Sequence, residues 1–121
     1  MARICLAEDD PSMRSFLTTA LQRAGHEVYA CENGEQALAA IGGKKYELLL
    51  SDIVMPGMDG ITLARHTVQE SPETKIMFIT GFAAIAMTQL HDLKHKAAVY
   101  TKPFHLKDLV AQVDSFLSRA A

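Results

Sequence analysis

Acidic residues stand at the ends of two apolar runs of this chain. Glu8 and Asp9 follow the run at residues 4–7, and Asp52 follows the run at residues 48–51. Carboxylates about 5 Å apart repel by roughly 3 kcal/mol per pair at an effective dielectric constant of 20, so acids gathered in one place need a proton or a cation. Mg²⁺ takes oxygen ligands and usually keeps waters, which leaves room for a phosphate oxygen. The acids predict a magnesium site if folding brings the two runs together.

A hydroxyl group and a cation stand at the ends of two further apolar runs. Thr80 follows residues 76–79, and Lys102 follows residues 98–101. A metal and a lysine can neutralise charge on a transferring phosphoryl group, and a carboxylate can form an aspartyl-phosphate. The set therefore predicts a phosphoryl-handling site with Asp52 as the nucleophile. Lys102-Pro103 is also a candidate for a cis peptide bond, which would aim the lysine inward.

Each of these residues has a simpler interpretation when it is taken singly. An acid after a strand is often a helix N-cap, and Asp10 before Pro11 fits that role. Taken singly, Thr80 fits a turn residue, and Lys102 fits a solvated surface charge. Chance explains the joint pattern less well, because all of these positions fall at the same end of the predicted sheet.

Apolar runs alternate along the chain with stretches of helical pattern. In the helical stretches apolar residues recur at i, i+3 and i+4, around residues 13–24, 37–41, 61–68, 83–93 and 106–117. The predicted strands are residues 4–7, 28–31, 48–51, 76–79 and 98–101. This alternation predicts an α/β protein with a five-stranded parallel sheet and helices on both faces, a flavodoxin-like (βα)5 fold.

The predicted strand order explains why the acids should meet. Of the two common orders for such folds, five strands fit 2-1-3-4-5. The first and third strands are then neighbours where the winding reverses, and ligands bind there outside the carboxyl ends of the strands. Glu8, Asp9, Asp52, Thr80 and Lys102 are all expected at that end.

The composition is that of one ordinary globular domain. The 121 residues carry a net charge of −2 and no basic stripe, which argues against binding to nucleic acid. No apolar run approaches the roughly 20 residues of a membrane span, and the first residues lack the layout of a signal peptide, so a cytoplasmic location is expected. Cys5 and Cys31 are expected to be buried, reduced thiols; a disulfide between them is the less favoured alternative.

Four motifs together resemble the response-regulator receiver domain. They are LAEDD at residues 6–10, DIVMPGMDG at 52–60, ITG at 79–81 and TKPF at 101–104. The resemblance covers essentially the whole chain, so residues 1–121 are expected to form one receiver domain. Because the chain stops after its last helical pattern, no output domain is expected. The signal would then pass by direct contact with a partner protein.

The resemblance also implies a role for each site residue. Glu8 and Asp9 would serve the Mg²⁺ ion, with Asp9 the direct ligand, and the backbone carbonyl of Val54 would complete the metal shell. Asp52 would take its phosphoryl group from a phosphohistidine on a histidine kinase or histidine phosphotransferase. The phosphoryl oxygens would be bound by Thr80 and Lys102. Only slow self-hydrolysis is expected, and no catalysis on an outside substrate.

One position departs from the family pattern. Receivers often carry Tyr or Phe three residues before the lysine, as the rotating part of a switch, but here that position is Val99 and its neighbour is Tyr100. The movement of Thr80 toward the phosphate remains expected. Phe82 and Ile85 follow Thr80 and are a candidate partner surface; the alternative is that they simply cover the sheet.

Two segments, residues 76–84 and 102–106, resemble the CpdR-type single-domain regulators of alphaproteobacteria. That resemblance implies a phosphorylation-controlled adaptor for the ClpXP protease that acts on cell-cycle progression, with ClpX as a partner and the unphosphorylated form active.

Other functions remain open from the residues alone. A phosphate sink in a relay, or a chemotaxis-type single-domain regulator, would carry the same site. A phosphatase with an aspartyl-phosphate intermediate is disfavoured, because such enzymes often place a second Asp where this chain has Val54. His91 and His95 are spaced i, i+4 but lack a flanking Glu, so a solvated helix face is expected there.

Overall fold

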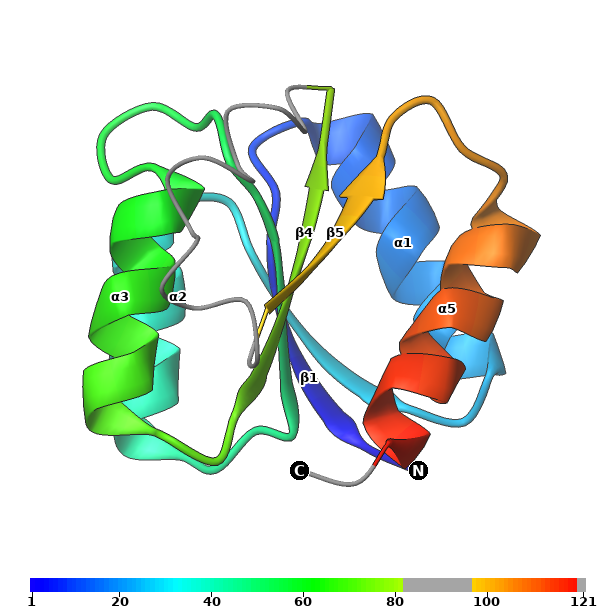
Figure 1. Cartoon of the computed structure of the whole chain (residues 1–121). Coiled ribbons are helices and arrows are strands. Elements are labelled where there is room, and N and C mark those ends of the chain that lie inside the picture. The colour runs from blue at the N-terminus through cyan, green and yellow to red at the C-terminus, as the bar shows by residue number, and fades with distance from the viewer. Residues whose placement is uncertain (82–96, 120–121) are drawn as a thin grey trace.

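The computed structural model describes residues 1–81 and 97–119. The elements are β1 (Arg3–Ala7), α1 (Pro11–Arg23), β2 (Glu27–Cys31), α2 (Gly34–Gly43), β3 (Leu48–Asp52), α3 (Gly60–Glu70), β4 (Lys75–Thr80), β5 (Ala97–Thr101) and α5 (Leu106–Ser118). Strands and helices alternate from β1 to β4, and β5 and α5 are the last two described elements, as Figure 1 shows. The helix expected around residues 83–93 lies outside the described residues, together with Phe82, Ile85, His91 and His95.

The strands form one parallel sheet in the order β2-β1-β3-β4-β5, which confirms the predicted α/β fold and strand order. Ala7 of β1 pairs with Ser51 of β3, so the residues that follow them, Glu8 and Asp52, leave the sheet side by side. On the other side of β3, Asp52 pairs with Ile79 of β4. The register therefore places the predicted site residues at one edge of the sheet.

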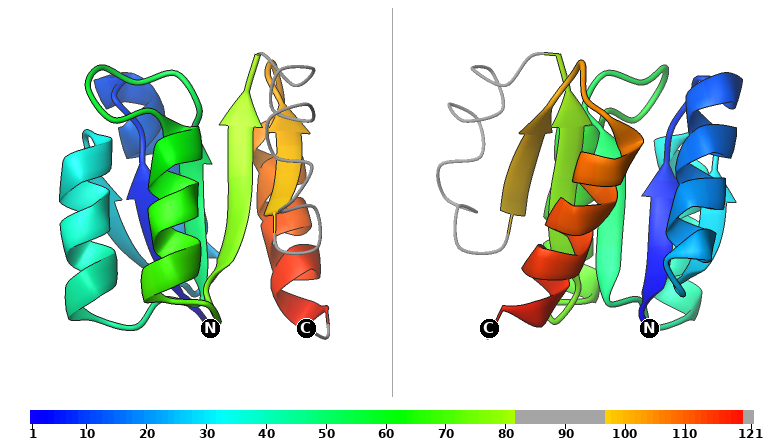
Figure 2. Two further views of the ribbon diagram at one scale, coloured as in Figure 1. Left: turned by 60° about the vertical axis from the view of Figure 1, so that its left-hand side comes forward. Right: turned by 90° about the vertical axis from the view of Figure 1, so that its right-hand side faces the viewer.

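Alternating side chains of the strands build two apolar layers. In β1, Cys5 packs into a buried cluster with residues of α2 and α3, including Ala37 and Leu63. Its neighbour Leu6 packs on the opposite face with residues of α1 and α5, including Leu17. Figure 2 shows the two helix pairs on opposite faces of the sheet. Because both faces are covered, the central strands are almost entirely apolar.

The first helix begins and ends where local chemistry predicts. Asp10 is its N-cap, and a carboxylate oxygen of Asp10 accepts the Ser12 amide hydrogen at 3.0 Å. Pro11 occupies the first turn, and Gly25 after the helix has φ +96°, a left-handed conformation that favours glycine. Phe16 has the apolar spacing of this helix but is 59% exposed.

The two cysteines lie in the interior as expected. Cys5 and Cys31 are buried and free, with no disulfide between them. A hydrogen bond with Cys31, together with burial, raises the pKa of the Cys5 thiol well above its ordinary value. Among the described residues no helix has the length and apolar character needed to cross a membrane.

Candidate functional site

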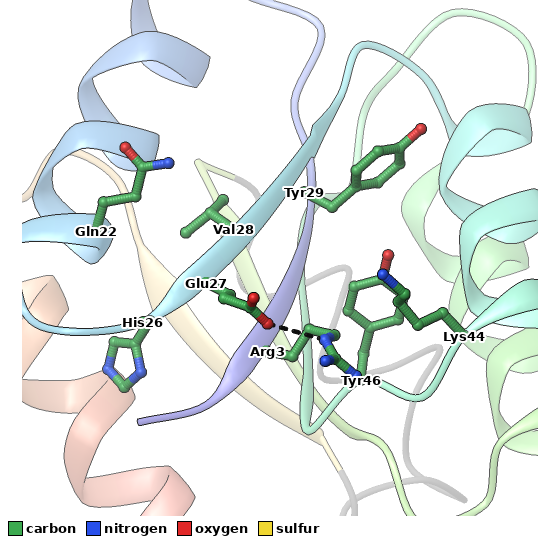
Figure 3. Close-up of a pocket in the computed structure, with 8 residues that line it drawn as sticks. All are labelled: Arg3, Gln22, His26, Glu27, Val28, Tyr29, Lys44 and Tyr46. Atoms are coloured by element: carbon green, nitrogen blue, oxygen red, sulfur yellow. Dashed lines mark hydrogen bonds and ion pairs between the residues drawn. The ribbon is translucent and has the colours of Figure 1, made fainter.

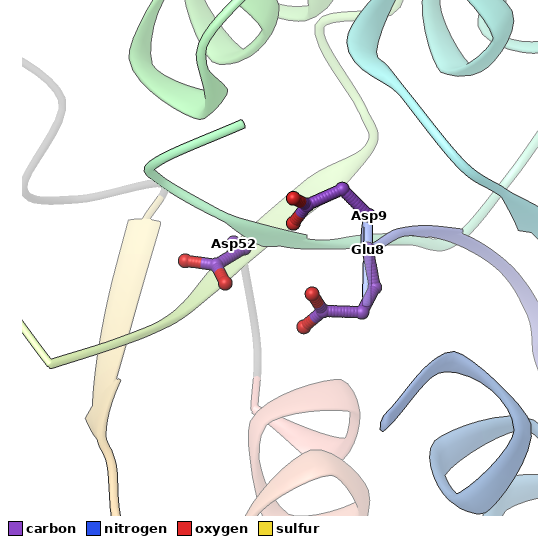
Figure 4. A group of neighbouring side chains, drawn as sticks. All are labelled: Glu8, Asp9 and Asp52. Carbon is purple, nitrogen blue, oxygen red and sulfur yellow. The ribbon is translucent and has the colours of Figure 1, made fainter. Parts of the chain in front are cut away.

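Three carboxylates converge at the carboxyl edge of the sheet. Glu8 and Asp9 follow β1 and Asp52 ends β3, and one oxygen from each of the three side chains lies within 4.8 Å of the others. Figure 4 shows the three side chains directed toward a common space. Glu8 and Asp52 are buried, at 1% and 8% exposure, whereas Asp9 is exposed. The site is therefore anionic, lined by interior groups and open on one side.

Lys102 reaches this cluster from the end of β5. Its Nζ atom lies 2.8 Å from Oδ2 of Asp52 and 3.7 Å from Oε1 of Glu8. Its backbone N–H donates to the carbonyl of Thr80 at 2.8 Å, which joins the ends of β4 and β5. The Lys102-Pro103 peptide bond is cis, as predicted. Thr80 is fully buried at the end of β4, one residue beyond the residue that pairs with Asp52.

Burial and charge act on two groups of the site. Burial raises the pKa of Glu8, and the carboxylates of Asp52 and Asp9 raise it further, against the opposing effects of the Asp10 amide and Lys102. Burial lowers the pKa of Lys102, but the hydrogen bond to Asp52 and the two acidic charges outweigh it, so the pKa is raised overall. The lysine is thus firmly protonated, while the ionised form of Glu8 is destabilised.

The donor set fits a hard divalent cation. Within the described part of the chain, Oε1 of Glu8 is buried and accepts no hydrogen bond. A buried carboxylate oxygen without a partner is unfavourable, and Lys102 at 3.7 Å is too distant to satisfy it. Mg²⁺ prefers oxygen ligands, usually one or two carboxylates together with waters, and the cluster of three carboxylates can supply them.

Asp52 is held in place by its own neighbours along the chain. Its Oδ1 accepts the amide hydrogen of Ile53 at 2.7 Å, and its carbonyl accepts the hydroxyl of Ser51 at 2.7 Å. Gly60 at the start of α3 packs directly on this turn, because a Cβ atom there would lie 2.0 Å from the Asp52 carbonyl oxygen. The amide of Gly60 also donates to the carbonyl of Ile53 at 2.8 Å.

Sequence reasoning missed the positioning roles of Ser51, Ile53 and Gly60. Gly60 ends the motif DIVMPGMDG, eight residues after Asp52, and was used only as part of a family resemblance. A close backbone approach of this kind has no periodic signal, and the second glycine of that motif was the one available hint of it. Val54 lies in the same loop and is 58% exposed.

Val99 and Tyr100 of β5 face opposite sides of the sheet. Val99 packs against the cluster of α2 and α3, whereas Tyr100 packs against the cluster of α1 and α5. The ring of Tyr100 meets that of Phe104 edge to face, with centroids 5.6 Å apart. Tyr100 therefore cannot take the place of an aromatic side chain at position 99 without leaving its own layer.

A second hollow, of about 330 Å³, lies along the edge strand β2. Figure 3 shows its lining residues on both sides of that strand, at the amino ends of β1 and β2. Its acid, Glu27, is paired with Arg3 at 3.0 Å. The hollow is at the opposite edge of the sheet from the carboxylate cluster and brings together no comparable set of reactive groups, so we place the candidate site at the cluster.

The fold and the acidic site together define a class of signalling protein. The chain belongs to the response regulator receiver domain family, whose model matches residues 4–114. It is 50% identical over 120 residues to the response regulator receiver protein CpdR of Brucella abortus, an alignment that covers 99% of this chain and 100% of that protein. The predicted resemblance to receivers, and to CpdR in particular, is thereby confirmed.

Solved structures agree with the family assignment. A CheY-like receiver domain protein from Methanospirillum hungatei is 27% identical with a TM-score of 0.87, over 97% of this chain and 94% of that one. The response regulator TrrA of Thermotoga maritima, solved in complex with Mg(2+)-BeF, is 30% identical with a TM-score of 0.83, over 95% of this chain and 98% of that one.

Proposed function

We propose that this receiver accepts a phosphoryl group on Asp52 from a phosphohistidine of a histidine kinase or histidine phosphotransferase. Glu8, Asp9, Asp52 and the backbone carbonyl of Val54 would hold the Mg²⁺ ion. The observation that carries the proposal is the meeting of three carboxylate oxygens within 4.8 Å beside the Lys102 ammonium group. The complex of TrrA with Mg(2+)-BeF, in a structure of the same fold, supports it.

The geometry suits an in-line displacement on phosphorus. The Lys102 ammonium group lies 2.8 Å from Oδ2 of Asp52, the carboxylate that acts as the nucleophile. An oxygen of Asp52 forms the new O–P bond as the P–N bond to the donor histidine breaks. The electron pair of that bond returns to the donor ring, which already carries a proton on its other nitrogen and so leaves as neutral imidazole. Mg²⁺, when bound, neutralises charge on the phosphoryl oxygens. The phosphorylated carboxyl group has lost its own charge, so Lys102 and Thr80 then bind the phosphoryl oxygens instead.

The output is a change in affinity for a protein partner. We propose that the whole chain, residues 1–121, works in the cytoplasm as a CpdR-like adaptor for ClpXP and thereby acts on cell-cycle progression. The 50% identity with CpdR over 120 residues supports this role. Val99 and Tyr100 of β5 are proposed as switch and partner residues, together with Phe82 and Ile85, which lie outside the described residues.

Partner binding should depend on the state of Asp52. We expect unphosphorylated protein to bind ClpX and to lose at least about tenfold in affinity when Mg²⁺ and beryllofluoride are added, which corresponds to about 1.4 kcal/mol. Titration of labelled receiver with ClpX, followed by fluorescence anisotropy, measures the change.

The matched control is Asp52→Asn, whose affinity for ClpX should not respond to beryllofluoride. Equal ClpX binding in both states of the native protein would favour a phosphate sink in a relay and would exclude the adaptor role. Steady release of phosphate from an added monoester would instead indicate a phosphatase.

The affinity for Mg²⁺ should fall as the pH is lowered. Because the pKa of Glu8 is raised from its ordinary 4.5, this carboxyl takes up a proton at higher pH than an ordinary one, and that proton removes one negative charge from the cluster that attracts the metal. For the same reason, the free energy of unfolding of the metal-free protein should fall as the pH rises above 4.5, because burial destabilises the ionised form of Glu8. Mg²⁺ titration calorimetry between about pH 7.5 and about pH 5.5 measures the effect.

Glu8→Gln serves as the control for this pH dependence. Its weaker Mg²⁺ affinity should change less with pH, since the amide does not titrate in this range. An affinity of the native protein that is constant over the same range would rule out a titrating carboxyl with a raised pKa at the metal.

A further inference from the structure

The loop from Ile53 to Asp59 carries the proposed metal ligand Val54 and is held at both ends. At its start, the carbonyl of Ile53 accepts the amide hydrogen of Gly60 at 2.8 Å. At its end, Asp59 caps α3 by accepting the amide hydrogen of Thr62 at 2.8 Å. Its middle arches toward the beginning of α2, as the left view of Figure 2 shows. The first turn of α2 therefore decides where the middle of the loop rests.

A carboxylate of α2 binds the backbone of this loop. Oε2 of Glu35 accepts the amide hydrogen of Met58 at 3.2 Å. The same carboxylate oxygen would lie 3.1 Å from a Cβ atom at Gly57, whose φ of +76° also favours glycine. The contact joins residues far apart in sequence, and the exposed position of Glu35 leaves its charge open to solvent.

The start of α2 also lies directly against Met58 of the loop. A Cβ atom at Gly34 would lie 2.8 Å from the carbonyl oxygen of Met58 and 2.9 Å from its Cβ atom. Such an approach fixes the distance between the helix and the loop, while the hydrogen bond from Met58 to Glu35 fixes the direction of the loop backbone. Only glycine fits at position 34.

The first turn of α2 is itself rigid enough to act as an anchor. Oδ1 of Asn33 accepts the amide hydrogen of Gln36 at 2.8 Å, and Oε1 of Gln36 accepts the amide hydrogen of Glu32 at 3.1 Å. The pair of bonds resembles a capping box, with the second bond made to the residue before the N-cap. Glu35 in this turn is thus presented to the loop by a capped helix start, and its negative charge also suits a helix amino terminus.

We propose that Glu35 is a positioning residue for the metal and phosphoryl site: it holds the loop so that the Val54 carbonyl lies at the acidic cluster. The inference rests on the proposed function, because it concerns the same site. Partners that orient metal ligands typically change metal affinity by 10- to 100-fold when removed, so Glu35→Ala should weaken Mg²⁺ binding by about tenfold. The amide hydrogen of Met58, freed from its acceptor, should exchange faster with solvent.

Three variants separate position from charge. Glu35→Ala removes both the acceptor and the charge, whereas Glu35→Gln keeps an acceptor oxygen and loses the charge. Glu32→Ala removes a nearby exposed charge and keeps the backbone amide that donates to Gln36. We expect slow exchange at Met58 and Mg²⁺ affinity within about twofold of the native value for Glu35→Gln and Glu32→Ala, as measured by amide exchange in metal-free protein and by Mg²⁺ calorimetry.

Two results would overturn the positioning role. One is native Mg²⁺ affinity in Glu35→Ala together with native exchange at Met58. The other is equal loss of affinity in Glu35→Ala and Glu35→Gln, which would make the effect one of charge alone. Failure of the native protein to bind Mg²⁺ at all would instead contradict the proposed function, and the Met58 exchange data would still report on the anchor.

Discussion

Asp52→Asn is expected to abolish phosphoryl acceptance. The amide has nearly the same shape as the carboxylate, but it lacks the negative charge that attacks phosphorus. The Ile53 amide and the Ser51 hydroxyl contact this residue in ways that an asparagine can keep, since the side-chain oxygen and backbone carbonyl remain. Intact-protein mass spectrometry after incubation with acetyl phosphate and Mg²⁺ measures the phosphorylated fraction, which should fall from most of the native protein to none.

Asp59→Asn is the matched control for this experiment. Asp59 is an exposed acid in the loop after β3, and asparagine is also a good N-cap. The phosphorylated fraction of this variant should equal that of the native protein. Phosphorylation of Asp52→Asn at another carboxylate, to the native extent, would contradict the assignment of Asp52 as the acceptor.

Gly60→Ala is expected to lower the free energy of unfolding by about 3 kcal/mol, at the upper end of typical overpacking effects. The added Cβ atom would lie 2.0 Å from the Asp52 carbonyl oxygen and 2.9 Å from the Ile53 Cα atom. Both are backbone atoms, which cannot move aside as a flexible side chain can. Either α3 or the end of β3 must shift, and the phosphoryl acceptor shifts with β3. Urea unfolding followed by circular dichroism measures the loss.

Gly43→Ala provides the control for glycine replacement. Gly43 ends α2, and a Cβ atom there would meet no atom within 4 Å. In a helix, alanine is favoured over glycine by about 0.5–1 kcal/mol, so this variant should be as stable as the native protein or more so. Unfolding of Gly60→Ala at the native urea concentration would show that the close approach at Gly60 does not matter.

The sheet and the acidic cluster were predictable for one physical reason. Strands covered on both faces read as continuous apolar runs, and residues that end parallel strands must emerge at one edge. The pairing of Ala7 with Ser51 then brings Glu8 beside Asp52, although 43 residues lie between them in the sequence. The cap at Asp10 and the stop at Gly25 were predictable because they depend on neighbouring residues only.

Contacts between elements could not be predicted from the sequence. Phe16 satisfies the helical spacing of α1 yet is 59% exposed, because no periodic pattern states how wide the buried stripe of a helix is. The approach of Gly60 to Asp52 and the bond between Glu35 and Met58 depend on how α2 and α3 pack beside β3. The orientation of Lys102 toward both Asp52 and Glu8 depends on tertiary structure in the same way.

A crystal structure of this protein with Mg²⁺ and beryllofluoride tests the central claim most directly. We predict beryllofluoride bonded to an Asp52 oxygen, Mg²⁺ at about 2.1 Å from oxygens of Asp9, Asp52 and the Val54 carbonyl, and Lys102 moved from Asp52 to a fluoride. A metal bound elsewhere, or an adduct on a carboxylate other than Asp52, would contradict the account.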